Sequence, residues 1–309
     1  MFPNLTISFK VVGEPLVSRL LTRVKYLPEI YEDEQNVSLN GTYDLCFMDM
    51  MVASDDFFRR MQDVSKLTIS LSPIFNQMSR VDLLFNRTKN HNLAESEQPK
   101  KIYAGLKYTI IQEDCKKIKT SIYEDNLDLD QFPIAISMGG GDAANRTLDF
   151  LHSLKNCKVP ATFWVMLGEG YRHSYDNLIK AIKKDSDHEI ILAKTNRSMW
   201  HILRNCILAI LPGGITTYEA AFAGLPTINF LHDPSKQYLI QELIDNKVCV
   251  YEGPIADEES LVQVNKSIEH FYYERRSLME MHLNTKNLVG RNSAKLIWDL
   301  CNEELEEKS

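Results

Sequence analysis

The sequence predicts two α/β domains, each built on a parallel β-sheet that is covered by helices. Apolar, β-branched runs alternate with amphipathic runs along most of the chain, and short joints separate them, which is typical of parallel sheets. The chain has 309 residues, of which 44% are apolar, so two domain cores of ordinary size are expected. Glycine clusters also follow two of the expected strands, as they do in doubly wound sheets.

In the first half, the apolar run Leu5–Val12 predicts a strand, and Gly13-Glu14-Pro15 separates it from an amphipathic segment at Leu16–Val24. The alternation continues as strand, helix, strand and strand at Tyr43–Met50, Ser54–Val64, Leu67–Leu71 and Val81–Phe85. Between Gln112 and Gln131 the pattern fades into a charged stretch, which we interpret as the interdomain connection. We therefore expect an N-terminal domain over residues 1–125.

The second half alternates more regularly and predicts a doubly wound domain with a helical tail over residues 126–309. The expected strands are Pro133–Met138, Thr162–Leu167, Glu189–Leu192, Cys206–Leu211, Thr227–Leu231 and Val248–Tyr251. The expected helices are Ala143–Leu154, Tyr175–Lys184, Met199–Asn205, Gln237–Asn246 and most of Glu258–Glu303. Ligands of such sheets bind beyond the carboxyl ends of the strands, where both glycine clusters of this half fall.

The strongest functional signal is the run from Ile210 to Thr227. It predicts the end of a buried strand, a turn at Gly213-Gly214, a short helix carrying Glu219, and a stop at Gly224-Leu225-Pro226. Glycines let backbone N–H groups approach a ligand, and the helix N-terminus behind them favours an anion. A carboxylate about one turn inside such a helix can accept hydrogen bonds from a sugar diol. We therefore expect Glu219 to hold a ribose while the glycines hold phosphate.

A second cluster, Gly139-Gly140-Gly141-Asp142, lies between another expected strand and helix. Taken alone, a tight turn in which Asp142 caps the helix explains it as well as a phosphate site does. Thr216 and Thr217 add donors after Gly213-Gly214, so the two clusters together favour one shared diphosphate site. Neither cluster has the glycine spacing of the dinucleotide fingerprint.

The order of these motifs resembles the nucleotide-binding domain of the two-domain B-type glycosyltransferases (GT-B). Within that superfamily the chain is most similar to the UDP-sugar hydrolase of pseudaminic-acid biosynthesis, and Gly105–Ile111 supports this likeness. The resemblance implies two Rossmann-like domains facing a cleft and a UDP-linked sugar as ligand. It also implies Glu219 on the ribose and Thr216 and Thr217 near phosphate. Asp233 and Gln237 are expected near the sugar, and for Gln237 the pyrophosphate is an alternative contact.

The chain departs from this family in the first loop, where the family has Gly-x-Gly-His-x-x-Arg with a catalytic histidine. Here the loop is Gly13-Glu14-Pro15-Leu16-Val17-Ser18-Arg19, so Leu16 stands in the place of the histidine. Two weak candidates for a catalytic role are His232 and Asp49, both at expected strand ends. A polar rim residue is the alternative interpretation of His232, and a strand-end cap is that of Asp49.

The net charge of −7, with no basic patch apparent in the sequence, argues against nucleic-acid binding. Six widely spread cysteines are typical of reduced thiols, and no apolar run reaches the roughly 18 residues of a membrane span. We expect a cytoplasmic protein that binds a UDP-sugar and needs neither cofactor nor metal, with an oligomer left open. The leading hypothesis is a UDP-sugar hydrolase; the alternatives are a GT-B glycosyltransferase and a non-catalytic nucleotide-sugar-binding protein.

Overall fold

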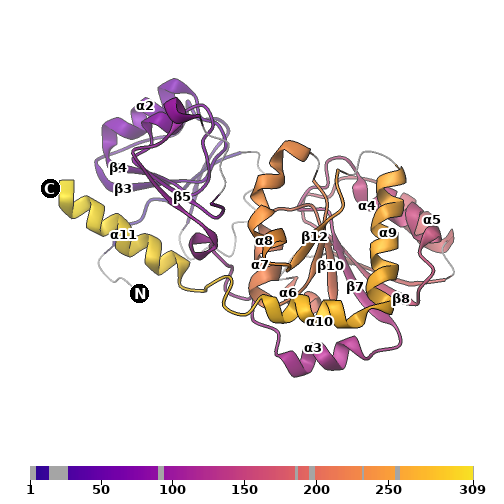
Figure 1. The fold of residues 1–309 in the computed structure, drawn as a ribbon. Coiled ribbons are helices and arrows are strands. Elements are labelled where there is room, and N and C mark those ends of the chain that lie inside the picture. The colour runs from indigo at the N-terminus through magenta and orange to yellow at the C-terminus, as the bar shows by residue number, and fades with distance from the viewer. Residues whose placement is uncertain are drawn as a thin grey trace. The chain divides into compact units, whose positions relative to one another are not determined.

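A computed structural model describes residues 5–13, 27–89, 94–184, 187–194, 199–231, 233–254 and 258–308. The chain forms two compact α/β units (Figure 1). Unit 1 comprises residues 1–87, 92–104 and 295–309, and unit 2 comprises residues 88–91 and 105–294. All strand pairs among the described residues are parallel, as predicted.

Unit 1 contains a four-stranded sheet in the order β3-β4-β5-β6 and a separate pair, β1-β2. The strands are β1 (Lys10–Val12), β2 (Glu29–Tyr31), β3 (Tyr43–Met48), β4 (Ser65–Ser70), β5 (Leu83–Asn86) and β6 (Lys101–Ala104). Helix α2 (Asp55–Val64) follows Ser54, whose hydroxyl accepts a hydrogen bond from the backbone N–H of Phe57. Phe57 and Phe58 point from this helix into the core of the unit. The sequence predicted β3, α2, β4 and β5 but not β2 or β6.

Helix α11 (Ser293–Lys308) contributes residues from the far end of the chain to unit 1. Glu304 accepts a hydrogen bond from the Tyr103 hydroxyl (2.7 Å) and forms an ion pair with Lys101. Lys308 lies 3.1 Å from the buried carboxylate of Asp82. The units therefore differ from the expected division between residues 125 and 126, because residues 105–125 group with unit 2 and residues 295–309 with unit 1.

Unit 2 contains a six-stranded sheet in the order β12-β11-β10-β7-β8-β9. The strands are β7 (Phe132–Ser137), β8 (Ala161–Leu167), β9 (Glu189–Lys194), β10 (Leu208–Leu211), β11 (Thr227–Asn229) and β12 (Cys249–Tyr251). Numbered along the chain within this unit, they follow the order 3-2-1-4-5-6 of a doubly wound sheet, read from the β9 edge. The direction of winding reverses between β7 and β10, which are hydrogen-bonded neighbours.

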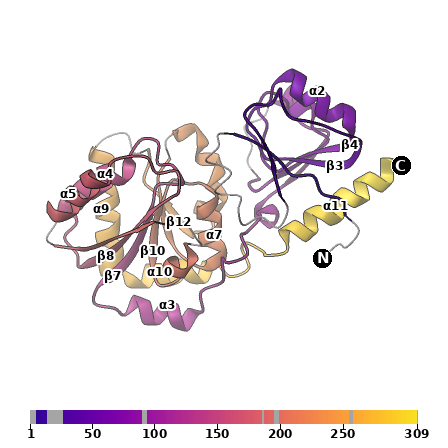
Figure 2. The same cartoon turned by 180° about the vertical axis from the view of Figure 1, so that it is seen from behind.

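Helices cover both sides of the unit 2 sheet. Helices α4, α5 and α9 gather at one side, whereas α7 lies at the other (Figures 1 and 2). The helices of this unit are α3 (Thr120–Leu127), α4 (Arg146–Ser153), α5 (Tyr175–Lys184), α6 (Trp200–Leu203), α7 (Ile215–Ala223), α8 (Gln241–Asp245), α9 (Glu258–Tyr273) and α10 (Arg275–Asn284). Helix α4 begins three residues later than predicted, because Asp142 and Asn145 have left-handed φ values of 44° and 54°.

The stretch from Gln112 to Gln131 was expected to be a connection, but it contains helix α3 and packs on unit 2. Its apolar side chains are few, so the sequence lacks a helical hydrophobic pattern. Tyr123 and Leu127 nevertheless lie buried on one face, and the Tyr123 hydroxyl donates to the carbonyl oxygen of Ile207 (2.7 Å). Besides these two side chains, the Arg275 guanidinium group holds the end of this polar helix by donating to the carbonyl oxygens of Leu127 (2.6 Å) and Leu129 (3.0 Å).

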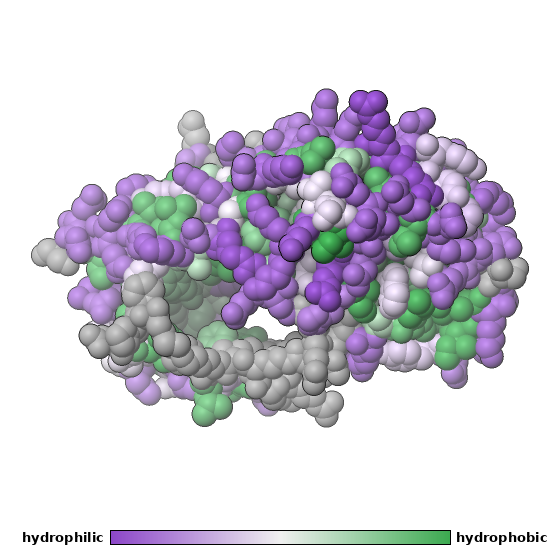
Figure 3. Space-filling model, turned by 90° about the horizontal axis from the view of Figure 1, so that it is seen from below, coloured by the Kyte–Doolittle hydropathy of each residue, from purple (hydrophilic) through white to green (hydrophobic). Residues whose placement is uncertain are grey.

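Polar side chains dominate the face of the molecule in Figure 3, where apolar residues gather in smaller patches. All six cysteines have free thiols. No helix among the described residues is both long and apolar enough to cross a membrane.

Candidate functional site

The two glycine clusters follow β7 and β10, the strands between which the winding of the unit 2 sheet reverses. In the register of this pair, Ile210 lies opposite Ile136, and three further residues bring Gly213 level with Gly139. Both glycines have positive φ, 73° and 89° respectively. Neighbouring strands lie about 4.8 Å apart, so the chain makes two left-handed turns side by side at the carboxyl edge of the sheet. This is the edge at which doubly wound sheets bind ligands.

The glycines of these turns differ in how much space surrounds the position that a side chain would occupy. A Cβ atom on Gly139, Gly140 or Gly214 would meet no heavy atom within 4 Å. A Cβ atom on Gly213 would lie 2.4 Å from Cδ2 of Leu231, a buried side chain just beyond β11. Gly213 is therefore favoured by its left-handed φ and by the close Leu231 methyl group, whereas Gly139, Gly140 and Gly214 leave backbone accessible to a ligand.

The helices behind the two turns differ in how their N-termini are satisfied. At α4, the carboxylate of Asp142 accepts hydrogen bonds from the backbone N–H groups of Arg146 (2.8 Å) and Thr147 (2.9 Å), which confirms the predicted cap. At α7 the capping position is Gly214, which has no side chain, and among the described residues no side-chain cap is found. The positive end of α4 is thus already matched by a carboxylate, while that of α7 is left for a ligand.

A third loop, between β8 and α5, supports the first glycine cluster. A Cβ atom on Gly168 would lie 2.3 Å from the carbonyl oxygen of Gly140, and the N–H of Gly170 donates to that same oxygen (3.0 Å). His173 Nε2 lies 2.8 Å from the carbonyl oxygen of Asp142. Sequence reasoning missed this loop, although Gly168-Glu169-Gly170 after a predicted strand was a usable signal.

Glu219 lies in the second turn of α7 with only 4% of its surface exposed. Its carboxylate accepts hydrogen bonds from the side-chain amide (2.8 Å) and the backbone N–H (3.4 Å) of Gln112. Burial raises the pKa of Glu219, and the hydrogen bonds from Gln112 oppose that rise. Gln112 itself is exposed, so this buried carboxylate has a partner side chain at the surface.

The two threonines predicted to lie near phosphate differ in their surroundings. The Thr217 hydroxyl is buried and donates to Oδ1 of Asn229 (2.8 Å), which ties α7 to β11. Thr216 is half-buried, in the first turn of α7. Thr216 therefore has the better placed hydroxyl, and the predicted phosphate contact of Thr217 stays a prediction.

The predicted sugar contacts lie after β11. Asp233 caps the short helix Pro234–Leu239 and accepts hydrogen bonds from the backbone N–H (3.0 Å) and hydroxyl (2.7 Å) of Ser235, which lower its pKa. Gln237 is half-buried and donates to Oε1 of Gln241 (3.1 Å). Both side chains are thus engaged within the protein, and their contact with a sugar remains a prediction.

The structure adds little about the two weak catalytic candidates, His232 and Asp49. His232, like Leu16 and Arg19 of the first loop, lies outside the described residues. Asp49 follows β3 of unit 1, is exposed, and accepts a hydrogen bond from the Ser72 hydroxyl (3.1 Å). That bond is what a strand-end cap would make.

The sequence was also compared with protein families and with curated proteins. No protein-family model matches the sequence. Over 273 residues the chain is 21% identical to the uncharacterized protein MJ1062 of Methanocaldococcus jannaschii. The alignment covers 85% of this chain and 56% of that protein, so the chain spans little more than half of its curated relative.

Solved structures match over most of the chain. Acinetobacter baumannii MurG matches with a TM-score of 0.52 and 15% identity, over 96% of this chain and 73% of that one. A putative UDP-N-acetylglucosamine 2-epimerase from Listeria monocytogenes matches with 0.55 and 16%, over 85% and 75%. The pneumococcal O-GlcNAc transferase GtfA in complex with UDP and GlcNAc matches with 0.53 and 13%, over 86% and 57%. The predicted fold class is confirmed: the chain is α/β, with two Rossmann-like units of the GT-B type.

Proposed function

We propose that the chain is a nucleotide-sugar enzyme of surface-glycan synthesis, which binds a UDP-sugar at the carboxyl edge of the unit 2 sheet and cleaves the bond between the sugar and UDP. One observation carries the proposal: two left-handed glycine turns stand side by side at the winding reversal, next to the uncapped N-terminus of α7. A neighbour of the same fold, the transferase GtfA, has been solved with UDP and GlcNAc, which supports this choice of ligand.

In this proposal the diphosphate lies over Gly139–Gly141 and Gly213-Gly214, where N–H groups and the positive end of α7 offset its charge. Thr216 and Thr217 complete the phosphate contacts, and Asp233 and Gln237 face the sugar. The leaving group is UDP, so negative charge grows on the diphosphate as the bond breaks. Fixed N–H donors aimed at that charge lower the barrier for cleavage.

Glu219 holds the ribose in this proposal, and Gln112 gives a reason why the site is stable when empty. A buried carboxylate without partners is costly, and the Gln112 amide supplies one in the free protein. A ribose diol offers two hydroxyl donors at the same carboxylate. We expect it to displace the exposed Gln112 side chain while the buried Glu219 stays in place.

Three functions are compatible with this site, and they differ in what, if anything, attacks the sugar. With water as the nucleophile, the chain is a hydrolase similar to that of pseudaminic-acid biosynthesis; with an acceptor hydroxyl, it is a glycosyltransferase. Leu16, where the related hydrolases have histidine, favours a third reading, a binding protein without catalysis. Release of UDP from a panel of UDP-sugars, with and without candidate acceptors, distinguishes them. Release without acceptor supports the hydrolase, acceptor-dependent release supports the transferase, and binding without release supports the third.

The ribose contact has a test of its own, in which UDP is compared with 2′-deoxy-UDP by isothermal titration calorimetry. Wild-type protein should prefer UDP, because the deoxy ligand lacks one donor to Glu219. In Glu219→Ala the affinity for UDP should fall by roughly 1.5 to 3 kcal/mol, the range for hydrogen bonds to a charged group, and the preference should disappear.

Gln112→Ala is the matched control, because it removes the side-chain amide that contacts the carboxylate and leaves the carboxylate and the backbone N–H of residue 112 in place. It should bind UDP at least as tightly as wild type. If Glu219→Ala keeps both the affinity and the preference for UDP, the assignment of Glu219 to the ribose is wrong.

A further inference from the structure

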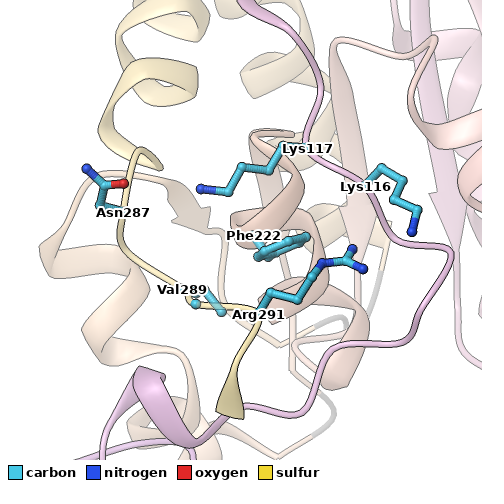
Figure 4. Close-up of a pocket in the computed structure, with 7 residues that line it drawn as sticks. Lys116, Lys117, Phe222, Asn287, Val289 and Arg291 are labelled. Carbon is cyan, nitrogen blue, oxygen red and sulfur yellow. The ribbon is translucent and has the colours of Figure 1, made fainter. Parts of the chain in front are cut away.

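A surface pocket of about 630 Å³ lies in unit 2 beside the C-terminal end of α7. Lys116 and Lys117 line it from the segment before α3, and Asn287 and Arg291 from the segment after α10 (Figure 4). The ring of Phe222, near the end of α7, forms its floor. The Lys117 ammonium group lies 5.5 Å and the Arg291 guanidinium carbon 5.1 Å from the ring centroid, within cation–π range.

The guanidinium group of Arg291 is held in place by the backbone of the opposite segment. One of its nitrogens donates to the carbonyl oxygen of Glu113 (3.2 Å), and another donates to that of Cys115. These bonds fix the orientation of the group and leave further N–H donors for a ligand. In Figure 4 the Arg291 guanidinium and the Lys116 ammonium group point toward the same region.

The positive charge of this pocket is not matched within the described part of the chain. Neither lysine nor Arg291 comes within ion-pair distance of a described carboxylate, although Glu113 and Asp114 lie in the same segment. The C-terminus of α7 presents only about half a negative charge. The three positive charges of Lys116, Lys117 and Arg291 exceed this half charge, although the chain as a whole has a net charge of −7.

We propose that this pocket binds the phosphate group of an anionic ligand. A phosphate accepts several hydrogen bonds at once, and on one side of Phe222 the pocket offers the fixed Arg291 guanidinium group and the Lys116 ammonium group, while Lys117 and Asn287 lie on the other side (Figure 4). The site is separate from the nucleotide edge, because Ile215 and Phe222 lie at opposite ends of α7, about 10 Å apart along the helix axis. It does not depend on the proposed enzymatic activity.

The test titrates inorganic pyrophosphate into the 309-residue chain saturated with UDP, which fills the proposed nucleotide site, and follows the affinity by calorimetry and the Arg291 Nε–H signal by NMR. Lys116→Gln/Lys117→Gln removes two charges from the pocket. Lys180→Gln/Lys183→Gln removes two charges from α5, where both side chains are exposed, and serves as the matched control. We expect a shift of the Arg291 signal in wild type, and an affinity at least about tenfold weaker in the pocket variant than in the control.

A second arm identifies the source of the phosphate by sedimentation with phosphatidylcholine vesicles, with or without phosphatidic acid. Retention that needs phosphatidic acid and is lost in the pocket variant assigns the site to a lipid headgroup, whereas pyrophosphate binding alone assigns it to a free phosphate. If the pocket variant and the control behave alike in both arms, the proposal is overturned. If the double variant does not fold, the single variant Lys116→Gln is compared with the same control, because the Lys116 side chain is exposed.

Discussion

Substituting alanine at two neighbouring glycines, Gly213 and Gly214, separates packing from ligand binding at the candidate site. At Gly213, φ is +73° and the new Cβ would lie 2.4 Å from the buried Leu231 side chain. The left-handed conformation costs a non-glycine residue about 1 to 2 kcal/mol, and overpacking a buried contact adds about 1 to 3 kcal/mol. We expect Gly213→Ala to lower the free energy of unfolding of unit 2 by about 2 to 5 kcal/mol.

Gly214→Ala should behave in the opposite way. Its φ is −80°, and its Cβ would point into open space at the N-terminus of α7. Alanine is therefore tolerated there, and stability should change by less than about 1 kcal/mol. The methyl group would instead occupy the place proposed for the diphosphate, so we expect UDP to bind at least about tenfold more weakly.

The assay for stability is urea denaturation followed by tryptophan fluorescence. Trp164 and Trp200 lie in unit 2, and Trp298 lies in α11 of unit 1. A Trp298→Phe background lets the signal report unit 2 alone, so the two units need not unfold together. Equal stability of the two alanine variants would refute the packing argument. Wild-type UDP affinity in Gly214→Ala would refute the placement of the diphosphate.

Three further predictions concern the loop that contacts Gly140 and the pH dependence of stability in each unit. Gly168→Ala should weaken UDP binding without touching the ligand, because its Cβ would lie 2.3 Å from the Gly140 carbonyl oxygen and displace that loop; calorimetry measures this. Burial would raise the pKa of Asp82, but hydrogen bonds from Lys100, Thr68 and Lys308 outweigh it and lower the pKa from 3.8 to about 2. The ionised Asp82 therefore stabilises unit 1 by about 2 kcal/mol above about pH 4, and this stabilisation is lost as the pH falls to about 2. In the Asp82→Asn variant, urea unfolding monitored by Trp298 should not show this acid-dependent decrease in stability. Burial lowers the pKa of His282 below 6.5, so unit 2 should lose stability as the pH falls below about 6.5, and Gln at this position should flatten the profile of its unfolding midpoint.

The sequence predicted those parts of the site that depend on one continuous segment. Gly213, Gly214 and the start of α7 lie within a few residues of one another, and glycine after a buried strand is a strong local signal. The cap formed by Asp142 was predictable for the same reason, since its partners Arg146 and Thr147 are four and five residues away.

Contacts between distant segments were not predictable in this way. Gln112 and Glu219 are 107 residues apart, and Gln112 fell in a stretch that we interpreted as a connection. The basic pocket escaped notice because Lys116 and Lys117 are far along the chain from Arg291, so no run of positive charge appears in the sequence. Strands β2 and β6, of three and four residues, are too short for their alternation to be distinguished from the surrounding loop.

The placement of α11 in unit 1 bears on how the protein is made. Synthesis delivers the main body of unit 2, residues 105–294, before the ribosome reaches residues 295–308, which unit 1 requires. Until then Lys101 and Tyr103 lack Glu304, and Asp82 lacks Lys308. The N-terminal unit therefore acquires its α11 contacts only after residues 105–294 have been made, and a nascent chain that stalls before residue 295 lacks them.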